Sequence, residues 1–225
     1  PAHGSQSQAF FKSHGLSDPE VLAALTDRSL QFVHMVPALP PQFVRLTDGL
    51  VLRIGDHDWH CISGYGHAPE HMALHCPELN VLISGDMVLP RISSNISVYD
   101  TEPQADPLRL FMQSLTRYTE LPVDCLVLPS HGKPFTGLHQ RIAQLLQHHR
   151  DRLNDLRQAF NLDGMTAMDA MAVLFKRPLD SHQTTFALGE SLAHLHCLWF
   201  GGELRRSLAA DGIYRFTPTA AMLRP

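Results

Sequence analysis

The stretch GYGHAPEH at residues 64–71 decides the fold prediction, together with two stretches that follow it in the chain. These are LISGDMVLP at 82–90 and LVLPSHGKPF at 126–135. Each joins a β-like apolar run to a side chain that commonly binds metals: histidine, then aspartate, then histidine. Small residues beside these side chains allow tight turns and keep them accessible.

The three side chains in question are His67, Asp86 and His131, which are separated by 19 and 45 residues. They can form one site only if the fold assembles it from three loops. Neutral imidazoles and a carboxylate converging on a divalent ion, with a position left open for water, are what metal-dependent hydrolysis requires. We therefore take these three residues as the candidate metal ligands.

Two other interpretations of these histidines remain open. The chain has 15 histidines, and a single histidine is more often a surface or hydrogen-bonded residue than a ligand. The three motifs could also coincide by chance in an unrelated α/β protein. Side-chain distances separate these possibilities from a shared site. His194 and His196 fall in a helical stretch, where residues two apart point to different sides, so we expect them in a helix core or on its surface.

Composition indicates a globular chain without a membrane anchor. The 225 residues are 44% hydrophobic and 18% charged, and no apolar run approaches the roughly 20 residues that span a bilayer. The four cysteines are widely spaced without a CxxC pair, so we expect reduced thiols and a cytoplasmic protein. The net charge is −4, and residues 139–225 carry only 10 Lys/Arg against 8 Asp/Glu, which is weak for a nucleic-acid-binding face.

Periodicity predicts a mixed α/β order in the first part of the chain. A helix is expected from a capping box at Ser17–Glu20 to Pro37. Short strands follow, and the turn between the first two lies at Gly55-Asp56-His57. A helix over 106–119 and a buried strand over 125–129 complete this part.

From residue 138 the pattern becomes helical. It predicts a long amphipathic helix over 138–160, a second helix that opens with Thr166-x-x-Asp169, and a third over 185–200. A small hairpin around Asp211-Gly212 follows. This order suits a winged-helix module, and a plain three-helix cap would give nearly the same pattern.

The three motifs resemble those of the metallo-β-lactamase fold hydrolases, which include glyoxalase II, lactonases, lactamases and several nucleases. GYGHAPEH is similar to the family's GHxxGH segment, ISGDMV to the segment with the bridging carboxylate, and PSHGKPF to the last metal-binding histidine with its glycine. The resemblance implies that His67 and His131 are terminal ligands and that Asp86 bridges two divalent ions. The ions would be zinc, with iron or manganese as alternatives. His71 would be a nearby hydrogen-bonding residue rather than a ligand.

The family's HxHxDH motif does not occur in this sequence. The resemblance therefore implies the later part of an αββα sandwich over residues 1–137, followed by a helical winged-helix-like domain over 138–225. We expect Pro1 to mark a truncation, and we expect this chain alone to bind metal weakly and to be inactive. The apolar sheet face would be covered by the missing N-terminal half or by a second copy of the chain.

The intact protein is expected to hydrolyse an ester, thioester, lactam or phosphodiester bond of a small-molecule substrate with a metal-bound hydroxide. The alternative is a nucleic-acid- or protein-binding module, with RNA as a weakly supported partner, in which the hydrolase part is a structural remnant. Four residues lie beside the metal motifs and could meet an anionic or carbonyl oxygen of a substrate: Arg91, Asn95, Tyr99 and Lys133. A solvated loop is the more frequent role for each, and we name none of them as catalytic.

Overall fold

The computed structural model describes residues 3–25, 36, 38 and 40–222. The chain forms two compact units, each built from separated stretches. Unit 1 combines Pro1–Gln42, Ser97–Asp106 and Arg152–Pro225, and unit 2 combines Phe43–Ile96 and Pro107–Asp151. The chain thus leaves unit 2 after its first sheet strands and later returns to complete it. The predicted boundary between a domain of residues 1–137 and a domain of residues 138–225 stays a prediction.

Unit 2 contains a five-stranded sheet in the order β1-β2-β3-β4-β5. The first four strands are antiparallel neighbours, whereas β5 pairs with β4 in parallel. The predicted turn lies between β1 and β2, where Gly55 has a φ of 61°. The strands are β1 (Val51–Ile54), β2 (His57–Gly64), β3 (His71–Cys76), β4 (Val81–Gly85) and β5 (Leu126–Pro129).

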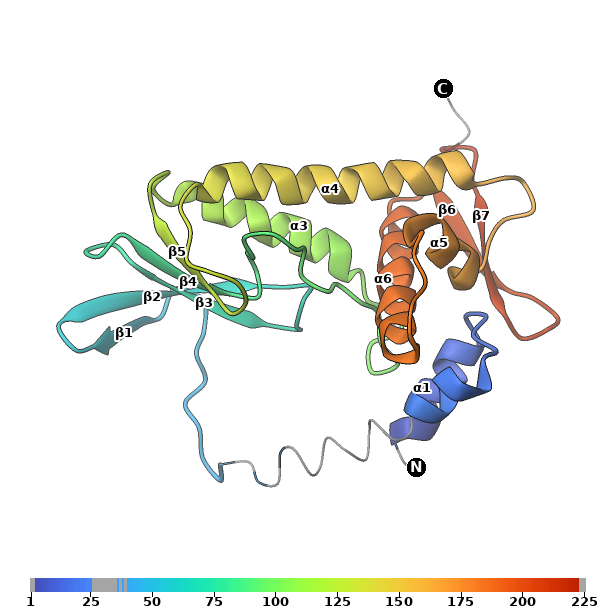
Figure 1. Ribbon diagram of the computed structural model, residues 1–225, viewed down its shortest axis with the longest axis horizontal. Helices are drawn as coiled ribbons and strands as arrows, with labels where there is room; N and C mark the ends of the chain where they lie inside the picture. The colour runs from blue at the N-terminus through green and yellow to red at the C-terminus, as the bar shows by residue number, and fades with distance from the viewer. Residues whose placement is uncertain (1–2, 26–35, 37, 39, 223–225) are drawn as a thin grey trace. The chain divides into compact units, whose positions relative to one another are not determined.

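Helix α3 (Pro107–Arg117) and the start of α4 (Leu138–Ala159) run along one side of this sheet (Figure 1). The helix predicted over 106–119 is present, and its apolar residues Leu108, Phe111 and Leu115 are fully buried. The Phe111 ring meets His149 of α4 edge-on, with 5.6 Å between ring centroids. Apolar residues spaced three and four apart therefore fix how α3 packs.

The opposite sheet face is apolar and half open. Leu74 pairs with Ile83, and Ile83 pairs with Leu128, so these side chains share one face. Ile83 and Leu126 each keep 38% of their surface exposed. Their strand neighbours on the other face, such as Leu82, are fully buried. We name this surface the open sheet face and define it by Leu74, Ile83, Leu126 and Leu128.

Unit 1 is mainly helical. Helix α5 begins after the predicted cap, because Thr166 and Asp169 form the reciprocal bonds of a capping box. Helix α6 carries the buried core of this unit, and it begins after its Asp180 cap, earlier than the predicted start at residue 185. The element bounds are His3–Lys12 for α1, Ala167–Leu174 for α5, Ser181–Phe200 for α6, and Leu204–Leu208 and Tyr214–Pro218 for the hairpin strands β6 and β7.

One predicted helix start was wrong in detail. The cap is Asp18 rather than Ser17, because the Asp18 carboxylate accepts hydrogen bonds from the N–H groups of Glu20 (2.8 Å) and Val21 (3.3 Å). Residues 19–25 are helical. The predicted helix end at Pro37 lies outside the described residues.

The mixed α/β architecture is confirmed, and the expected helices and hairpin after residue 138 are present. A winged-helix arrangement of these elements stays a prediction. Among the helices that the structure describes, none has the length and apolar character needed to cross a bilayer.

Candidate functional site

The sheet topology brings three chain segments to one edge. β2 and β4 are both antiparallel to β3, and β5 is parallel to β4, so β2, β4 and β5 end at the same edge. His67 follows β2, Asp86 follows β4 and His131 follows β5. The predicted candidates are therefore placed together by strand direction, despite their separation in the chain.

Each oxygen of the Asp86 carboxylate faces a different histidine. The distance from Asp86 Oδ2 to His67 Nε2 is 3.7 Å, and the distance from Asp86 Oδ1 to His131 Nε2 is 3.4 Å. The His131 side chain is the most exposed of the three, at 70%. Within the described part of the chain, no group of three His, Cys, Asp or Glu side chains is arranged to hold one metal ion. The three residues thus form two pairs that share Asp86.

The hydrogen bond of His67 sets which ring nitrogen can bind a cation. Its Nδ1 lies 2.9 Å from the backbone carbonyl of Asn95, which can only accept, so Nδ1 carries the proton. In the neutral ring, Nε2 then presents its lone pair toward the Asp86 carboxylate. The Nε2 lone pair and the Asp86 Oδ2 are both acceptors, and their separation of 3.7 Å leaves room for a cation bound by both.

His71 has a different role, because its Nε2 already accepts a hydrogen bond of 3.2 Å from the backbone N–H of Asp86. Its ring lies directly against Gly85, whose φ of 52° is in the left-handed region. Burial, with a further contribution from nearby His67, lowers the pKa of His71, which favours the neutral ring. His71 Nδ1 is buried without a hydrogen-bond partner among the described residues.

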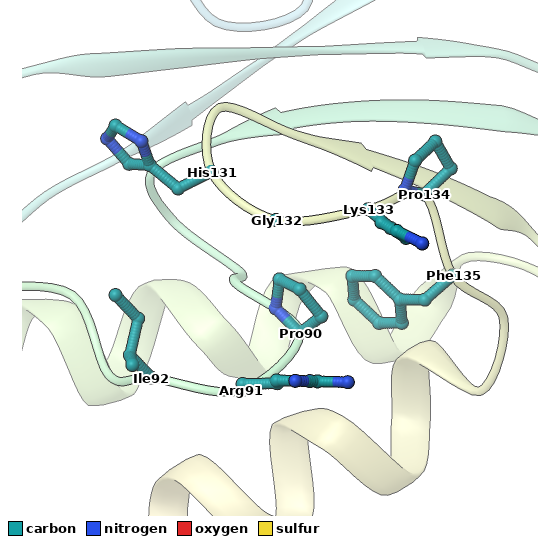
Figure 2. Close-up of a pocket in the computed structure, with 8 residues that line it drawn as sticks. All are labelled: Pro90, Arg91, Ile92, His131, Gly132, Lys133, Pro134 and Phe135. Atoms are coloured by element: carbon teal, nitrogen blue, oxygen red, sulfur yellow. The ribbon is translucent and has the colours of Figure 1, made fainter.

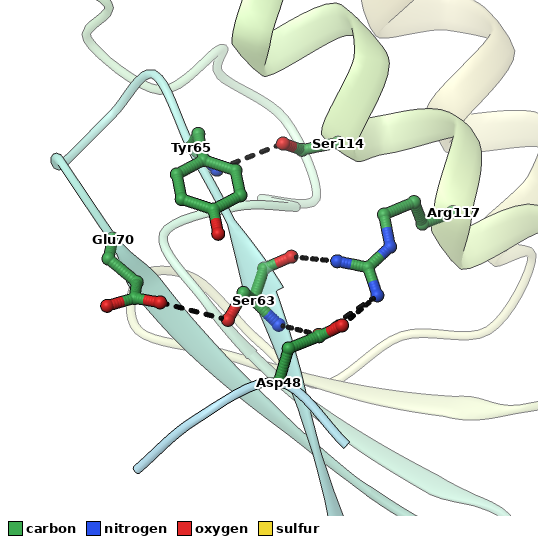
Figure 3. A network of polar contacts seen from close by, with 6 residues as sticks. All are labelled: Asp48, Ser63, Tyr65, Glu70, Ser114 and Arg117. Atoms are coloured by element: carbon green, nitrogen blue, oxygen red, sulfur yellow. Dashed lines mark hydrogen bonds and ion pairs between the residues drawn. The ribbon is translucent and has the colours of Figure 1, made fainter. Parts of the chain in front are cut away.

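A polar network holds the end of β2, just before the His67 loop (Figure 3). Arg117 donates to the Ser63 carbonyl at 2.7 Å and to both carboxylate oxygens of Asp48 at 2.9 and 2.8 Å. Asp48 also accepts from the Ser63 N–H at 2.8 Å, and this bond, together with Arg117, lowers the pKa of Asp48. The N–H of Tyr65 donates to the Ser114 hydroxyl at 2.9 Å. α3 thereby fixes where the loop begins.

The chain after Asp86 is held by Arg141 of α4. Its Nε donates to the Leu89 carbonyl at 2.6 Å and a terminal nitrogen donates to the Ile92 carbonyl at 2.9 Å. The Ser94 hydroxyl donates to the carbonyl of Asp86 itself. Nothing in the local sequence marks Arg141 or Arg117 as parts of the site, because they act on backbone carbonyls far away in the chain.

The helical histidines are core residues of unit 1. His194 and His196 are fully buried, and Nδ1 of each lies 2.8 Å from a backbone carbonyl, that of Glu190 and of Ala105 respectively. Each bond occupies one ring nitrogen. Of the two positions expected for them, in the core or on the surface of a helical stretch, the structure shows the core.

Two family models match the chain. The model described as "Metallo-beta-lactamase superfamily" matches residues 11–131, and the one described as "Metallo-beta-lactamase-like, C-terminal domain" matches 153–219. A curated relative, "Probable metallo-hydrolase YqjP" of Bacillus subtilis, is 27% identical over 148 residues, which are 64% of this chain and 46% of the relative.

Two solved structures cover nearly the whole chain. A beta-lactamase domain protein from Burkholderia ambifaria is 50% identical with a TM-score of 0.86, over 93% of this chain and 60% of that protein. A metallo-beta-lactamase family protein from Thermus thermophilus is 30% identical with a TM-score of 0.77, over 97% of this chain and 65% of that protein. The chain thus spans less than two thirds of the length of these relatives. It belongs to the metallo-beta-lactamase superfamily.

Proposed function

We propose that this chain carries the His67, Asp86 and His131 ligands of a metal-dependent hydrolase. The observation that supports this most directly is that the two oxygens of Asp86 face one histidine each, at 3.7 and 3.4 Å. A carboxylate placed in this way suits a bridge between two cations. His67 and His131 are then terminal ligands of different ions.

The donor set of two imidazoles and a carboxylate suits zinc, and iron or manganese are alternatives. When bound, the ions would supply Lewis acidity and an activated water. The family's HxHxDH motif is absent from this sequence, so each ion would have only two protein ligands from this chain. We therefore propose that the 225-residue chain binds metal weakly and that hydrolysis belongs to a longer protein.

The chain's own residues prepare the site. The Asn95 carbonyl fixes the His67 tautomer that leaves Nε2 free to bind a cation. His71 accepts the Asp86 N–H and so positions the backbone that carries the carboxylate. The bond that is hydrolysed would be an ester, thioester, lactam or phosphodiester in a small molecule.

The alternative of an RNA-binding module has less support. Arg215 is paired with Asp211 at 2.7 Å. The Arg206 guanidinium lies over the rings of Trp199 and Tyr214, at 4.1 and 4.7 Å from their centroids. Two arginines of the β6–β7 hairpin are thus engaged within unit 1, and we do not propose nucleic-acid binding.

Zinc affinity tests the ligand assignment without requiring activity. Zinc is titrated into the 225-residue chain in competition with a chromophoric chelator. We expect His67→Ala, His131→Ala and Asp86→Asn each to weaken binding at least about tenfold, because each removes one of few ligands. His57→Ala is the matched control, since His57 is an exposed histidine of the same unit that pairs with Glu78.

Equal zinc affinity in all four variants and the parent chain would overturn the ligand assignment. A loss confined to the His67, Asp86 and His131 variants supports it. Circular dichroism of each variant checks that the fold is retained.

A further inference from the structure

A pocket of about 500 Å³ lies beside the candidate metal ligands, within the usual size range of small-molecule sites. It is formed by two loops of unit 2, and Figure 2 shows their side chains. Pro90, Arg91 and Ile92 come from the loop after β4, and residues 131–135 come from the loop after β5. His131 therefore belongs both to the ligand set and to the pocket wall.

Contacts within the chain hold both loops in place. The residues Val127 and Phe135 exchange two backbone hydrogen bonds, of 2.8 and 3.1 Å, which close the second loop into a short hairpin. Gly132 has a φ of 90°, and a Cβ there would lie 2.7 Å from the Pro90 ring, so only glycine lets the two loops approach this closely. The pocket walls are therefore fixed relative to each other.

Arg141 also fixes the backbone around Arg91. Its hydrogen bonds to the carbonyls of Leu89 and Ile92 lie on either side of Arg91 in the sequence. The base of the Arg91 side chain is thus positioned by a second arginine, and the described residues place no ion-pair partner at its own guanidinium. This arrangement lowers the entropy cost of binding at the pocket.

Two cationic side chains, Arg91 and Lys133, line the pocket. Among the described residues, no ion pair or side-chain hydrogen bond involves Arg91 or Lys133. By contrast, Arg45 and Arg53 of the same unit pair with Glu70 and Asp58. The protein has a net charge of −4, so two unpaired cations at one pocket are a local reversal of sign.

The pocket also has a direction. In Figure 2 the charged ends of Arg91 and Lys133 point to the same side of the view, with the rings of Pro90 and Phe135 between them, whereas the His131 imidazole points to the opposite side. A molecule lying along the pocket would meet apolar surface in the middle, cations at one end and the candidate metal ligands at the other.

We infer that this pocket binds the anionic end of the substrate, a carboxylate or phosphate held by Arg91 and Lys133. The substrate's apolar portion lies against Pro90, Ile92 and Phe135, and its scissile bond lies at the His131 end. The placement of the scissile bond rests on the proposed function; anion binding does not. Arg91 and Lys133 are specificity residues in this scheme, and neither takes part in the chemical step.

Anion binding is tested on the metal-free 225-residue chain by NMR titration with four probes that share one apolar tail: hexanoate, hexyl phosphate, hexanamide and hexanol. We expect both anions to shift the backbone signals of residues 90–92 and 131–135 and the neutral probes to bind at least about tenfold more weakly. The stronger of the two anions identifies carboxylate or phosphate as the natural group.

The double variant Arg91→Gln/Lys133→Gln should lose at least about tenfold in affinity for the anions and leave hexanol binding unchanged. Arg53→Gln is the matched control, because it removes an exposed arginine of the same unit outside the pocket. Signals of residues remote from the pocket report whether each variant folds as the parent does.

Equal binding of hexanoate and hexanamide, or full anion affinity in the double variant, would overturn the inference. Anion binding together with a failed zinc test would leave the anion pocket standing and remove the hydrolase assignment. In the active longer protein, the double variant should raise KM for an anionic ester about tenfold or more and leave kcat and the neutral ester unaffected. A fall in kcat with unchanged KM would count against the binding role.

Discussion

At the scale of single residues, hydrogen bonds give different roles to two histidines, His67 and His71, that lie four residues apart in the sequence. The Nδ1 of His67 donates a hydrogen bond to the Asn95 carbonyl, and its Nε2 faces the Asp86 carboxylate. His71 accepts a hydrogen bond from the Asp86 backbone N–H with its Nε2, so that nitrogen is already occupied. The same type of side chain thus presents Nε2 to the Asp86 carboxylate at one position and accepts a hydrogen bond from the Asp86 backbone at the other.

Gly85 is the residue on which the His71 contact depends. We expect Gly85→Ala to destabilise unit 2 by about 2–4 kcal/mol, because it combines a left-handed φ with a collision against the His71 ring. Gly55→Ala is the matched control, since Gly55 has a φ of 61° and open space around it, and we expect a loss of about 1 kcal/mol. Urea unfolding measures both. Equal losses would show that the His71 contact contributes nothing.

Residue patterns predicted the convergence of His67, Asp86 and His131 because each ends a strand, and strand direction is decided by pairing. They could not predict Arg117 or Arg141. These arginines donate to backbone carbonyls 54 and 52 residues away. Every residue has a backbone carbonyl, so the sequence does not indicate which one an arginine will bind. The carboxylate partner of Arg117, Asp48, is 69 residues away in the sequence.

At the scale of elements, apolar periodicity predicted where the helices and strands lie. Their exact first and last residues were predicted less accurately, because neighbouring side chains can compete to cap the same helix. The α3 positions Leu108, Phe111 and Leu115 are buried as the period requires. At residues 17–20, two adjacent residues can both cap a helix, and the carboxylate of Asp18 makes the bonds. The parallel pairing of β4 and β5 could not be predicted from the residues of the two strands alone. It depends on the long connection between them, which contains α3.

Two buried histidines of unit 1 should make it sensitive to acid. Burial lowers the pKa of His196 on α6 to about 4, and it does the same for His14, which follows α1; nearby Arg206 adds to both shifts. Below the ordinary pKa of 6.5, the unfolded chain binds protons that the folded chain does not, so stability falls as pH falls from 6.5 toward 4. We expect a loss on the order of 2 kcal/mol per histidine at pH 5 relative to pH 7.

Urea unfolding at pH 7 and pH 5 measures this loss. His196→Leu should flatten the pH dependence, since it removes one of the groups that take up protons on unfolding. His182→Leu, at an exposed position of the same helix α6, is the matched control substitution. An unchanged slope in His196→Leu would contradict the assignment.

At the scale of the whole molecule, the open sheet face leaves apolar side chains partly exposed. Ile83 and Leu126 are each 38% exposed on a face that also carries Leu74 and Leu128. We propose that a second layer covers this face, either from a longer protein or from another copy of the chain. Contiguous apolar surface of this kind usually marks an interface.

Light scattering of the 225-residue chain tests this proposal. We expect its mean mass to rise with concentration, and we expect Ile83→Ser/Leu126→Ser to shift the rise to at least about tenfold higher concentration. Leu162→Ser is the matched control, because Leu162 is a 79% exposed leucine of unit 1 outside this face. A constant monomer mass in the parent chain would exclude self-association, and equal behaviour of both variants would place the contact elsewhere.

The parallel neighbours β4 and β5 also have a consequence for the order of folding. Asp86 follows β4 directly, but β5 and His131 are synthesised only after the chain has passed through Ser97–Asp106 of unit 1 and the whole of α3. Closing so long a loop is slow compared with forming the β1–β4 hairpins. A nascent chain on the ribosome would therefore pair four strands first, which brings His67 near Asp86, and His131 would reach the shared carboxylate only when the last strand docks.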